Sequence, residues 1–450
     1  MARAKKEAAL TPEERLQAAL VPDWEWPYKL PKNWCWTTVG TICDGFQYGY
    51  TEKATFEKIG PHFIRITDIG DGIINDSGAP YCKIDSDSFI KYKINNDDIL
   101  IARMGSVGEN GLATHNIDGV FASYLIRIVP RSNAKYVCNF LQTNLYWGQI
   151  SEKAQGTTRL NVNANVLKNL IIPFPPFAEQ QRIVDRIESL FAKLDEAKEK
   201  AQAVVDSFET RKAAILHKAF TGELTAKWRE EHGVGMDSWE VRTLDSVCSS
   251  IFDGDHMPPP KAESGIPFLV ISNVNTGHLT FENTRFVPQE YYDVLSDTRK
   301  PQLGDVLYTL VGSFGIPVVV NSKRPFCFQR HMALLRPIDV SPQFLWYILQ
   351  TPEMYDKASS IATGTAQLTV PIKGLRAMTI SRPTIAEQVE IVRILDVFFA
   401  REHSAKEAAE AVLDQIDLMK KSILARAFRG ELGTNDPSEE SAVELLKQII

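Results

Sequence analysis

Two short glycine-flanked segments contain the residue types in this chain that are best suited to holding a ligand. Residues 103–108 read Arg-Met-Gly-Ser-Val-Gly and follow a β-branched, apolar run, and residues 156–159 read Gly-Thr-Thr-Arg. Glycine lets backbone amides approach a phosphate closely, while the hydroxyl and guanidinium groups add donors. A purely structural reading stays open, because tight turns require glycine for backbone reasons alone.

The chain contains two copies of one sequence unit. Residues 103–108 match 310–315 at an offset of 207, and residues 156–159 match 364–367 at an offset of 208. Further matches extend over nearly the whole chain: Trp34 with Trp239, Cys43 with Cys248, Pro175 with Pro383 and Glu179 with Glu387. This pattern indicates a duplicated domain rather than a solenoid, whose repeats are much shorter.

Around the glycine-flanked segments the two copies carry different polar side chains on a matching framework, which favours two related binding sites with different targets. Arg159 is suited to a guanine edge and Gln367 to an adenine edge. Drift after duplication would produce the same divergence. The candidate DNA-binding residues are Gln47, Tyr48, Arg65, Asp68, Arg103, Gly105, Ser106, Thr157, Thr158, Arg159, Asn273, Ser313, Arg330, His331, Thr365 and Gln367.

Each copy combines short strands with helices, so the predicted fold class is α+β. Runs rich in β-branched and aromatic residues predict strands over 63–69, 98–103 and 124–130, and over 268–274, 305–311 and 332–337 in the second copy. Residues 136–146 and 344–355 are expected to be helical.

A long heptad helix is expected to follow each globular part. Apolar residues alternate spacings of four and three, with Arg211 and Glu402 as the polar exceptions. The apolar seam includes Ile183, Ile187, Leu190, Leu194 and Phe208 in one helix and Ile391, Leu395, Phe398, Val412 and Ile416 in the other. So narrow a stripe needs a partner helix, which predicts an antiparallel coiled-coil spacer with pseudo-two-fold symmetry. Two independent helical hairpins are the alternative.

Both heptad helices are expected to end at a glycine, and short helices are expected at the chain termini. Gly222 and Gly430 occupy positions typical of a helix C-terminal cap. Residues 11–14 (Thr-Pro-Glu-Glu) form a capping-box signal for a helix through Leu20. Ser438 precedes the apolar run 442–449 and is expected to start a C-terminal helix. The terminal helices either contact a partner or pack loosely.

Signals for catalysis in this chain are missing. The sequence has no phosphate-binding G-x-x-x-x-G-K-[ST] loop, no G-x-G-x-x-G, no H-E-x-x-H and no G-x-S-x-G. The string Phe174-Pro175-Pro176-Phe177 resembles the N-P-P-F loop of DNA methyltransferases, but Phe174 cannot hydrogen-bond an amino group, so a structural turn is predicted. The histidines show no metal-ligand spacing, so no metal site is expected.

Composition places few limits on function. The net charge is −6, but Lys+Arg and Asp+Glu nearly balance over 30–175 (14 and 13), whereas 383–450 is acidic (8 and 13). Charge therefore neither supports nor excludes DNA binding. The six cysteines show no C-x-x-C pair and are expected to be reduced and mostly buried. Without an apolar run long enough to span a bilayer, the chain is expected to be cytoplasmic.

The whole pattern resembles the specificity (S) subunits of Type I restriction-modification systems. The resemblance is carried by P-P-F-A-E-Q-Q-R-I-V at 175–184 and P-T-I-A-E-Q-V-E-I-V at 383–392, each followed by a heptad helix and then A-F-T-G-E-L at 219–224 or A-F-R-G-E-L at 427–432. It implies two target recognition domains that each recognise half of a bipartite, asymmetric site in double-stranded DNA. The helical spacer would dock two modification (M) subunits.

The resemblance further implies that the chemistry belongs to other chains. The M subunits would use S-adenosylmethionine to methylate adenine at N6, and two restriction (R) subunits would add magnesium- and ATP-dependent translocation and cleavage. The chain itself would be non-catalytic and hold no cofactor. An autonomous two-module DNA-binding scaffold without a methyltransferase is the alternative function, and an enzyme in its own right is a third.

The domain organisation expected on this basis has six parts. They are an N-terminal extension (1–29), recognition domain 1 (30–174), a central helix with its connector (175–234), recognition domain 2 (235–382), a C-terminal helix (383–432) and a tail (433–450).

Overall fold

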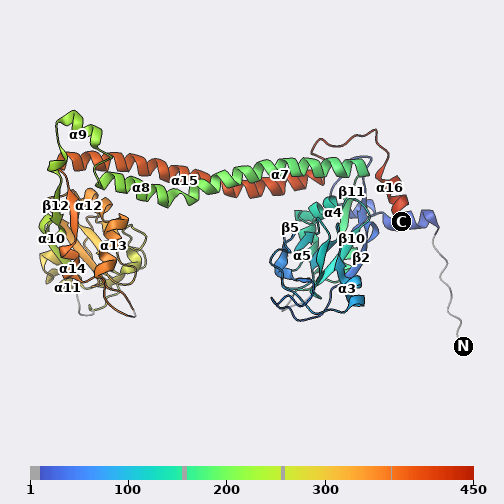
Figure 1. Ribbon diagram of the computed structural model, residues 1–450, viewed down its shortest axis with the longest axis horizontal. Helices are drawn as coiled ribbons and strands as arrows, with labels where there is room; N and C mark the ends of the chain where they lie inside the picture. The colour runs from blue at the N-terminus through green and yellow to red at the C-terminus, as the bar shows by residue number, and fades with distance from the viewer. Residues whose placement is uncertain (1–10, 155–159, 255–258, 366) are drawn as a thin grey trace. The chain divides into compact units, whose positions relative to one another are not determined.

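The computed structural model describes residues 11–154, 160–254, 259–365 and 367–450, and the chain divides into two compact units. Unit 1 comprises Met1–Ala201 and Ala411–Ile450, and unit 2 comprises Gln202–Glu410. Each unit therefore combines the globular part of one copy with helical segments from both copies (Figure 1).

Unit 1 is built on a six-stranded sheet of order β2-β10-β7-β8-β5-β4, a three-stranded sheet β3-β9-β6 and the pair β1-β11. Its strands are β1 Cys35–Thr38, β2 Cys43–Tyr48, β3 His62–Ile64, β4 Ile69–Gly70, β5 Gly72–Ile74, β6 Lys93–Ile94, β7 Ile99–Ala102, β8 Asn110–Leu112, β9 Ile117–Phe121, β10 Leu125–Pro130 and β11 Ile171–Phe174. Its helices are α1 Pro12–Ala19, α2 Val39–Ile42, α3 Ser86–Tyr92, α4 Ala134–Phe140, α5 Asn144–Lys153, α6 Ala164–Lys168, α7 Phe177–Asp206 and α16 Ala442–Ile449, with short 3-10 turns η1 Asp23–Glu25 and η2 Ile66–Asp68.

Unit 2 repeats this plan with sheets of order β13-β19-β16-β17 and β15-β14-β18 and the pair β12-β20. Its strands are β12 Glu240–Thr243, β13 Cys248–Asp253, β14 Ile266–Leu269, β15 Arg285–Val287, β16 Val306–Thr309, β17 Pro317–Val319, β18 Cys327–Phe328, β19 Met332–Pro337 and β20 Thr379–Arg382. Its helices are α8 Phe208–Phe220, α9 Ala226–His232, α10 Leu244–Val247, α11 Gln289–Asp293, α12 Pro342–Ile348, α13 Pro352–Ile361 and α14 Ile372–Ala377, with turns η3 Met236–Ser238, η4 Ile271–Asn273 and η5 Asp297–Arg299. Helix α15, Ile385–Ala427, contributes its part up to Glu410 to unit 2 and the remainder to unit 1.

Each predicted strand at 63–69 and 268–274 is wrong in its second half. Strands β3 and β14 end early, and each is followed by a 3-10 turn, η2 or η4. The cause is a side chain at the end of the turn that accepts a hydrogen bond from the backbone N–H three residues earlier. In the first copy, Arg65 N donates to Asp68 Oδ2 at 2.8 Å. Asn273 Oδ1 accepts from Val270 N at 3.0 Å in the second copy. Such local hydrogen bonds compete with strand formation.

The segments predicted as single helices at 136–146 and 344–355 are each two helices. Unit 1 has α4 and α5, and unit 2 has α12 and α13. At both breaks a threonine caps the N-terminus of the second helix. Thr143 Oγ1 accepts a hydrogen bond from Tyr146 N, and Thr351 Oγ1 accepts one from Met354 N. A threonine in this role favours a new helix start over continuation.

Within each unit, a helix of the first copy packs antiparallel against α15 of the second. In unit 1, Lys420 pairs with Asp195 and Lys198 with Asp417, so residue numbers rise in α7 as they fall in α15. In unit 2, Arg211 of α8 pairs with Glu402 of α15 at 2.7 Å. The predicted antiparallel pairing is confirmed, and the two polar exceptions of the heptad seams are partners of each other.

The seam differs from the prediction in two places. Ser207 separates α7 from α8, and its hydroxyl bonds the carbonyl of Ala203 one turn earlier, a contact that commonly bends helices. Val412, expected in the seam, is exposed. The other seam residues are buried (Ile183, Ile187, Ile391, Leu395 and Ile416) or half-buried (Leu190, Leu194, Phe208 and Phe398).

Specific contacts define the ends of the long helices and hold the short helices α1 and α16 in place. Gly222 and Gly430 adopt positive φ of 85° and 73° just past the helix ends, as predicted. The capping box of α1 is present, with Thr11 and Glu14 bonding reciprocally. The cap of α16 is Ser441 rather than the predicted Ser438, whose hydroxyl bonds Asp436 instead. Both terminal helices pack on the core of unit 1, so loose packing is wrong.

A buried Glu-Gln pair at the start of each long helix anchors it to its domain. In unit 1, Glu179 accepts hydrogen bonds from Trp34 Nε1 (3.1 Å) and Thr434 Oγ1 (3.2 Å), and burial raises the pKa of its carboxyl. Gln180 accepts from Asn133 N and donates to Pro175 O. These bonds tie the helix to β1, the α4 cap and the preceding turn.

Unit 2 repeats the anchor and adds a cation. Glu387 is fully buried and accepts from Trp239 Nε1 (3.0 Å) and from Arg229 Nη1 (2.5 Å). Arg229 is itself buried and also donates to Gly222 O. Gln388 accepts from Ser341 N and donates to Pro383 O.

All six cysteines are buried and none is part of a disulfide, in line with the expectation of reduced, mostly buried thiols. Burial raises the pKa of the Cys248 thiol to about 12 and that of Cys82 to about 11, which makes them poor nucleophiles at neutral pH. No helix in the described ranges is long and apolar enough to cross a membrane.

The buried ion pair yields the first prediction. Arg229→Ala should destabilise unit 2 by about 3–5 kcal/mol, because it leaves the Glu387 carboxylate buried without its cation. The control is Arg393→Ala, which removes a solvent-exposed guanidinium paired with Glu390 on the same helix and should cost far less, because solvent screens such a pair. Urea unfolding combined with hydrogen exchange of peptides from 385–400 measures both. Equal small losses for the two variants would show that Arg229 does not hold the anchor.

Candidate nucleic-acid interface

The first glycine-flanked segment forms the same exposed turn in both copies. It links β7 to β8 in unit 1 and β16 to β17 in unit 2. Gly105 and Gly312 adopt positive φ of 77° and 72°, a conformation that favours glycine. Ser106 and Ser313 follow at the tip and are exposed. The turn therefore presents backbone and hydroxyl groups to solvent, as a phosphate or base contact requires.

The second glycine of each turn has a structural role. A Cβ on Gly108 would lie 2.9 Å from the Trp147 ring, and one on Gly315 would lie 3.0 Å from the Tyr355 ring. Trp147 and Tyr355 occupy matching positions on α5 and α13, at an offset of 208. The structural reading thus holds for Gly108 and Gly315, whereas Gly105 and Gly312 lie at the exposed tip.

The second glycine-flanked segment lies against the first. In unit 2, Gly312 N donates to Leu368 O at 3.0 Å, and a Cβ on Gly312 would meet the Gln367 amide. Thr365 and Gln367 are both exposed there. In unit 1, Val162 N donates to Arg103 O at 2.9 Å. Thr157, Thr158 and Arg159 lie outside the described residues.

In unit 2 three of the candidate residues line one hollow of about 430 Å³. Arg330, His331 and Gln367 line it, together with Asp253 at the end of β13. Burial, and secondarily the charge of Arg330, lowers the pKa of His331, so its imidazole is neutral at neutral pH. A guanidinium, a neutral imidazole and an amide together offer donors and acceptors suited to base edges.

In unit 1 the corresponding residues form a stack. The Arg103 guanidinium lies 4.8 Å from the centroid of the Tyr48 ring, and the Tyr48 hydroxyl accepts from Ala164 N. Gln47 is used within the domain, where its amide oxygen accepts from Arg127 and its nitrogen donates to Lys91 O. The two units thus present different side chains at the same place in the fold.

Three further candidates, Arg65, Asp68 and Asn273, make hydrogen bonds within the turns after β3 and β14. Arg65 forms a bidentate pair with Asp68 at 3.0 Å and lies 5.9 Å from the exposed Phe56 ring. Asn273 is buried and donates to Glu282 O in addition to capping its turn. Arg65 keeps an exposed face, whereas the polar atoms of Asn273 serve the fold.

One duplicated feature next to β2 and β13 was missed in the sequence. Lys168 lies over the Phe46 ring at 5.3 Å, and Arg376 lies over the Phe252 ring at 5.1 Å. The two cations match at an offset of 208, which was the available signal. They add positive charge next to β2 and β13 in both copies.

Two copies of one domain carry different polar side chains at the same place in the fold, a Tyr48–Arg103 stack in unit 1 and a hollow lined by Arg330, His331 and Gln367 in unit 2. Within the described ranges no group of three or more His, Cys, Asp or Glu side chains could hold a metal ion. The family model for the Type I restriction modification DNA specificity domain matches residues 37–205 and 236–412. The chain therefore belongs to this family, whose members are the non-catalytic specificity subunits.

Individual relatives agree with this membership over nearly the whole chain. The EcoKI specificity subunit of Escherichia coli K12 is 26% identical over 94% of this chain and 96% of its own length. The StySPI specificity subunit of Salmonella potsdam is 23% identical over 90% of each. The fold matches the HsdS subunit of Thermoanaerobacter tengcongensis with a TM-score of 0.61 at 21% identity, over 91% of this chain and 100% of that one.

The turn after β3 gives a prediction in which the second copy supplies the control. Asp68→Ala should destabilise unit 1 by about 1–2 kcal/mol, because the Arg65 amide loses its acceptor. Asp68→Asn should cost less than about 1 kcal/mol, because Asn273 caps the same turn in unit 2 with an amide oxygen. Urea unfolding of both variants measures the difference. If Asn is as costly as Ala, the Arg65 ion pair rather than the cap holds this turn.

Proposed function

We propose that each copy recognises one half of a bipartite, asymmetric site in double-stranded DNA. Residues 30–174 would contact one half-site and residues 235–382 the other. The observation that carries the proposal is the divergence of side chains on an unchanged frame, with a Tyr48–Arg103 stack in one unit and Arg330, His331 and Gln367 in the other. Arginine suits guanine and glutamine suits adenine in the major groove.

Backbone groups and cations in both units would supply the contacts that do not depend on DNA sequence. The exposed turns at Gly105 and Gly312 present amides and hydroxyls suited to phosphates. Lys168 and Arg376 add cations next to β2 and β13. Phosphate contacts would fix the register of each domain on the duplex, and the divergent side chains would then discriminate between bases.

The proposal extends to the partners. The chain would dock two modification subunits, which carry S-adenosylmethionine and methylate adenine at N6, and two restriction subunits, which use ATP and magnesium. Apolar side chains on the outer faces of the long helices support a docking role: Phe177, Ile385, Val389 and Leu418 are all at least half exposed. Exposed apolar residues repeated at matching positions, as Phe177 and Ile385 are, favour protein contact.

A domain exchange tests this function. Replacing residues 235–382 with the second domain of another specificity subunit should change one half of the methylated motif and leave the other intact, because each domain contacts its own half-site. The reciprocal exchange of 30–174 is the matched control and should change the opposite half. Single-molecule sequencing of adenine methylation, with the modification subunit present, gives the result. A change in both halves from one exchange would contradict the modular assignment.

A further inference from the structure

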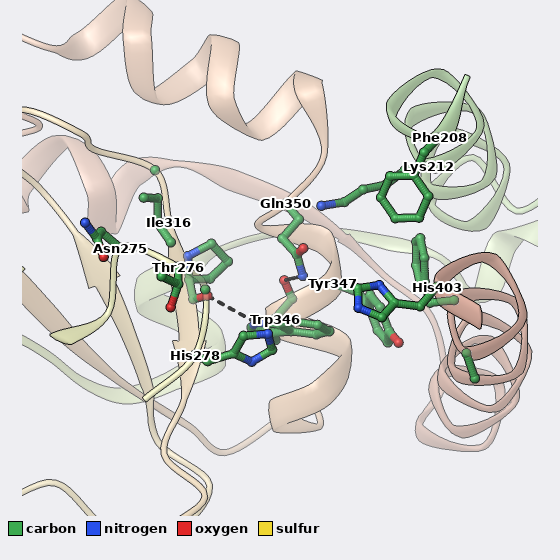
Figure 2. A pocket seen from close by; sticks show the side chains of 15 residues that line it. Phe208, Lys212, Asn275, Thr276, His278, Ile316, Trp346, Tyr347, Gln350 and His403 are labelled. Carbon is green, nitrogen blue, oxygen red and sulfur yellow. Dashed lines mark hydrogen bonds between the residues drawn. The ribbon is translucent and has the colours of Figure 1, made fainter. Parts of the chain in front are cut away.

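Unit 2 contains a second hollow, larger than the one lined by Gln367 and distinct from it. Its volume is about 700 Å³, within the range of about 300–1,000 Å³ typical of small-molecule sites. Helices α8, α12 and α15 and the loop at 275–278 contribute its walls (Figure 2). The two hollows have no lining residue in common.

The floor of this hollow is aromatic and rigid. Trp346 donates its indole N–H to Pro317 O at 3.1 Å, which fixes the ring. Tyr347 stacks on Phe399 with 5.6 Å between centroids and donates its hydroxyl to Asp396. Phe208 completes the aromatic lining from α8. Flat aromatic surfaces held in place this way suit a planar ring.

The charged groups of the hollow are cationic or can become so. Lys212, His278 and His403 line it, and no carboxylate is among its described lining residues. Figure 2 shows the Lys212 side chain extending from α8 toward Gln350. Among described residues, Lys212 has no carboxylate within ion-pair distance, and the carboxylate nearest His403 is Glu407 at 3.9 Å.

Comparison with unit 1 shows that the matching lysine there has an acidic partner, which Lys212 lacks among the described residues. At an offset of 208, Lys212 corresponds to Lys420 and His403 to Asp195. In unit 1, Lys420 pairs with Asp195 at 2.5 Å and lies over the Phe191 ring. The exchange of aspartate for histidine thus removes the anion that satisfies the lysine.

The aromatic floor of the hollow also differs between the two units. Trp346 corresponds to Cys138 in unit 1, whose thiol contacts the carbonyl of Gly72. Tyr347 likewise corresponds to Asn139. Unit 2 has therefore gained aromatic surface where it has lost an acid. Both changes fit an occupant that is planar and negatively charged.

We propose that this hollow binds a small anion that carries a planar ring, of the mononucleotide class. The ring stacks against the aromatic floor, and the phosphate takes the place of the missing aspartate between Lys212 and His403. Gln350, Asn275 and Thr276 at the rim offer hydrogen-bonding groups for the ring edge. The site stands apart from the hollow assigned to DNA, so it does not depend on the half-site proposal.

Isothermal titration of the full chain with AMP tests the proposal. Wild-type protein should bind one AMP, and Lys212→Gln should weaken binding about tenfold by removing a charge-assisted hydrogen bond. His403→Asp should weaken it at least as much, because it restores the acid that satisfies the lysine in unit 1. His403 is largely exposed, so this variant should fold normally. Absence of AMP binding at millimolar concentration, or wild-type affinity in both variants, would overturn the proposal.

Matched controls locate the site and define its ligand. Lys420→Gln, the same change in unit 1, should leave AMP affinity unaltered, and an equal loss there would contradict the assignment. Adenosine and ribose 5-phosphate should each bind more weakly than AMP, because each lacks one of the two recognised parts. If ribose 5-phosphate binds as tightly as AMP, the aromatic floor contributes nothing and the proposal fails. If duplex DNA without a recognition site displaces AMP and His403→Asp weakens both equally, the hollow is a DNA contact instead.

Discussion

The structure of each unit depends on the buried carboxylate at the start of a long helix. Glu179 and Glu387 are fully buried, and each accepts an indole N–H from the tryptophan that opens its domain. A buried charge is tolerated only where hydrogen bonds or a cation satisfy it, so domain, turn and helix must adopt one relative placement within the unit. The neighbouring glutamines, Gln180 and Gln388, extend this constraint to the α4 and α12 caps.

The duplication acts as an internal comparison that separates scaffold from site. Several features held in both copies are structural: the anchor, the second glycine packed on an aromatic ring, and the side-chain cap after β3 and β14. Among the features that differ, Arg330 and Gln367 are exposed and line the hollow of unit 2. Family membership gives the chain its DNA recognition role.

Much of this organisation could be predicted from the sequence because it follows from the spacing of apolar residues and the offset between the two copies. The duplication, the heptad helices, their antiparallel pairing and the terminal glycines depend on periodicity and offsets, which a single chain displays. The partnership of Arg211 with Glu402 was not predicted, although both were visible as polar exceptions, because pairing two heptad seams requires their axial register. The break at Ser207 depends on a hydrogen bond from its hydroxyl to the Ala203 carbonyl, which the spacing of apolar residues does not reveal.

The candidate site was predicted less completely. Divergence between copies singled out Arg330, His331 and Gln367, which the structure brings together in one hollow. It did not distinguish Asn273 and Gln47, whose polar groups are used inside their domains, because side-chain partners far apart in sequence are set by the fold. Ser441 replaced Ser438 as a cap for a similar reason, since both residues suit the role and Asp436 occupies the hydroxyl of Ser438.

We infer that two copies of one scaffold recognise two different DNA sequences. Mapping genomic adenine methylation by single-molecule sequencing, in cells with this chain and in cells lacking it, is the most direct test. We expect a chain-dependent motif with two unlike halves separated by unspecified bases. A chain-dependent motif with two identical half-sites, or a methylation pattern that does not change when the chain is removed, would contradict it.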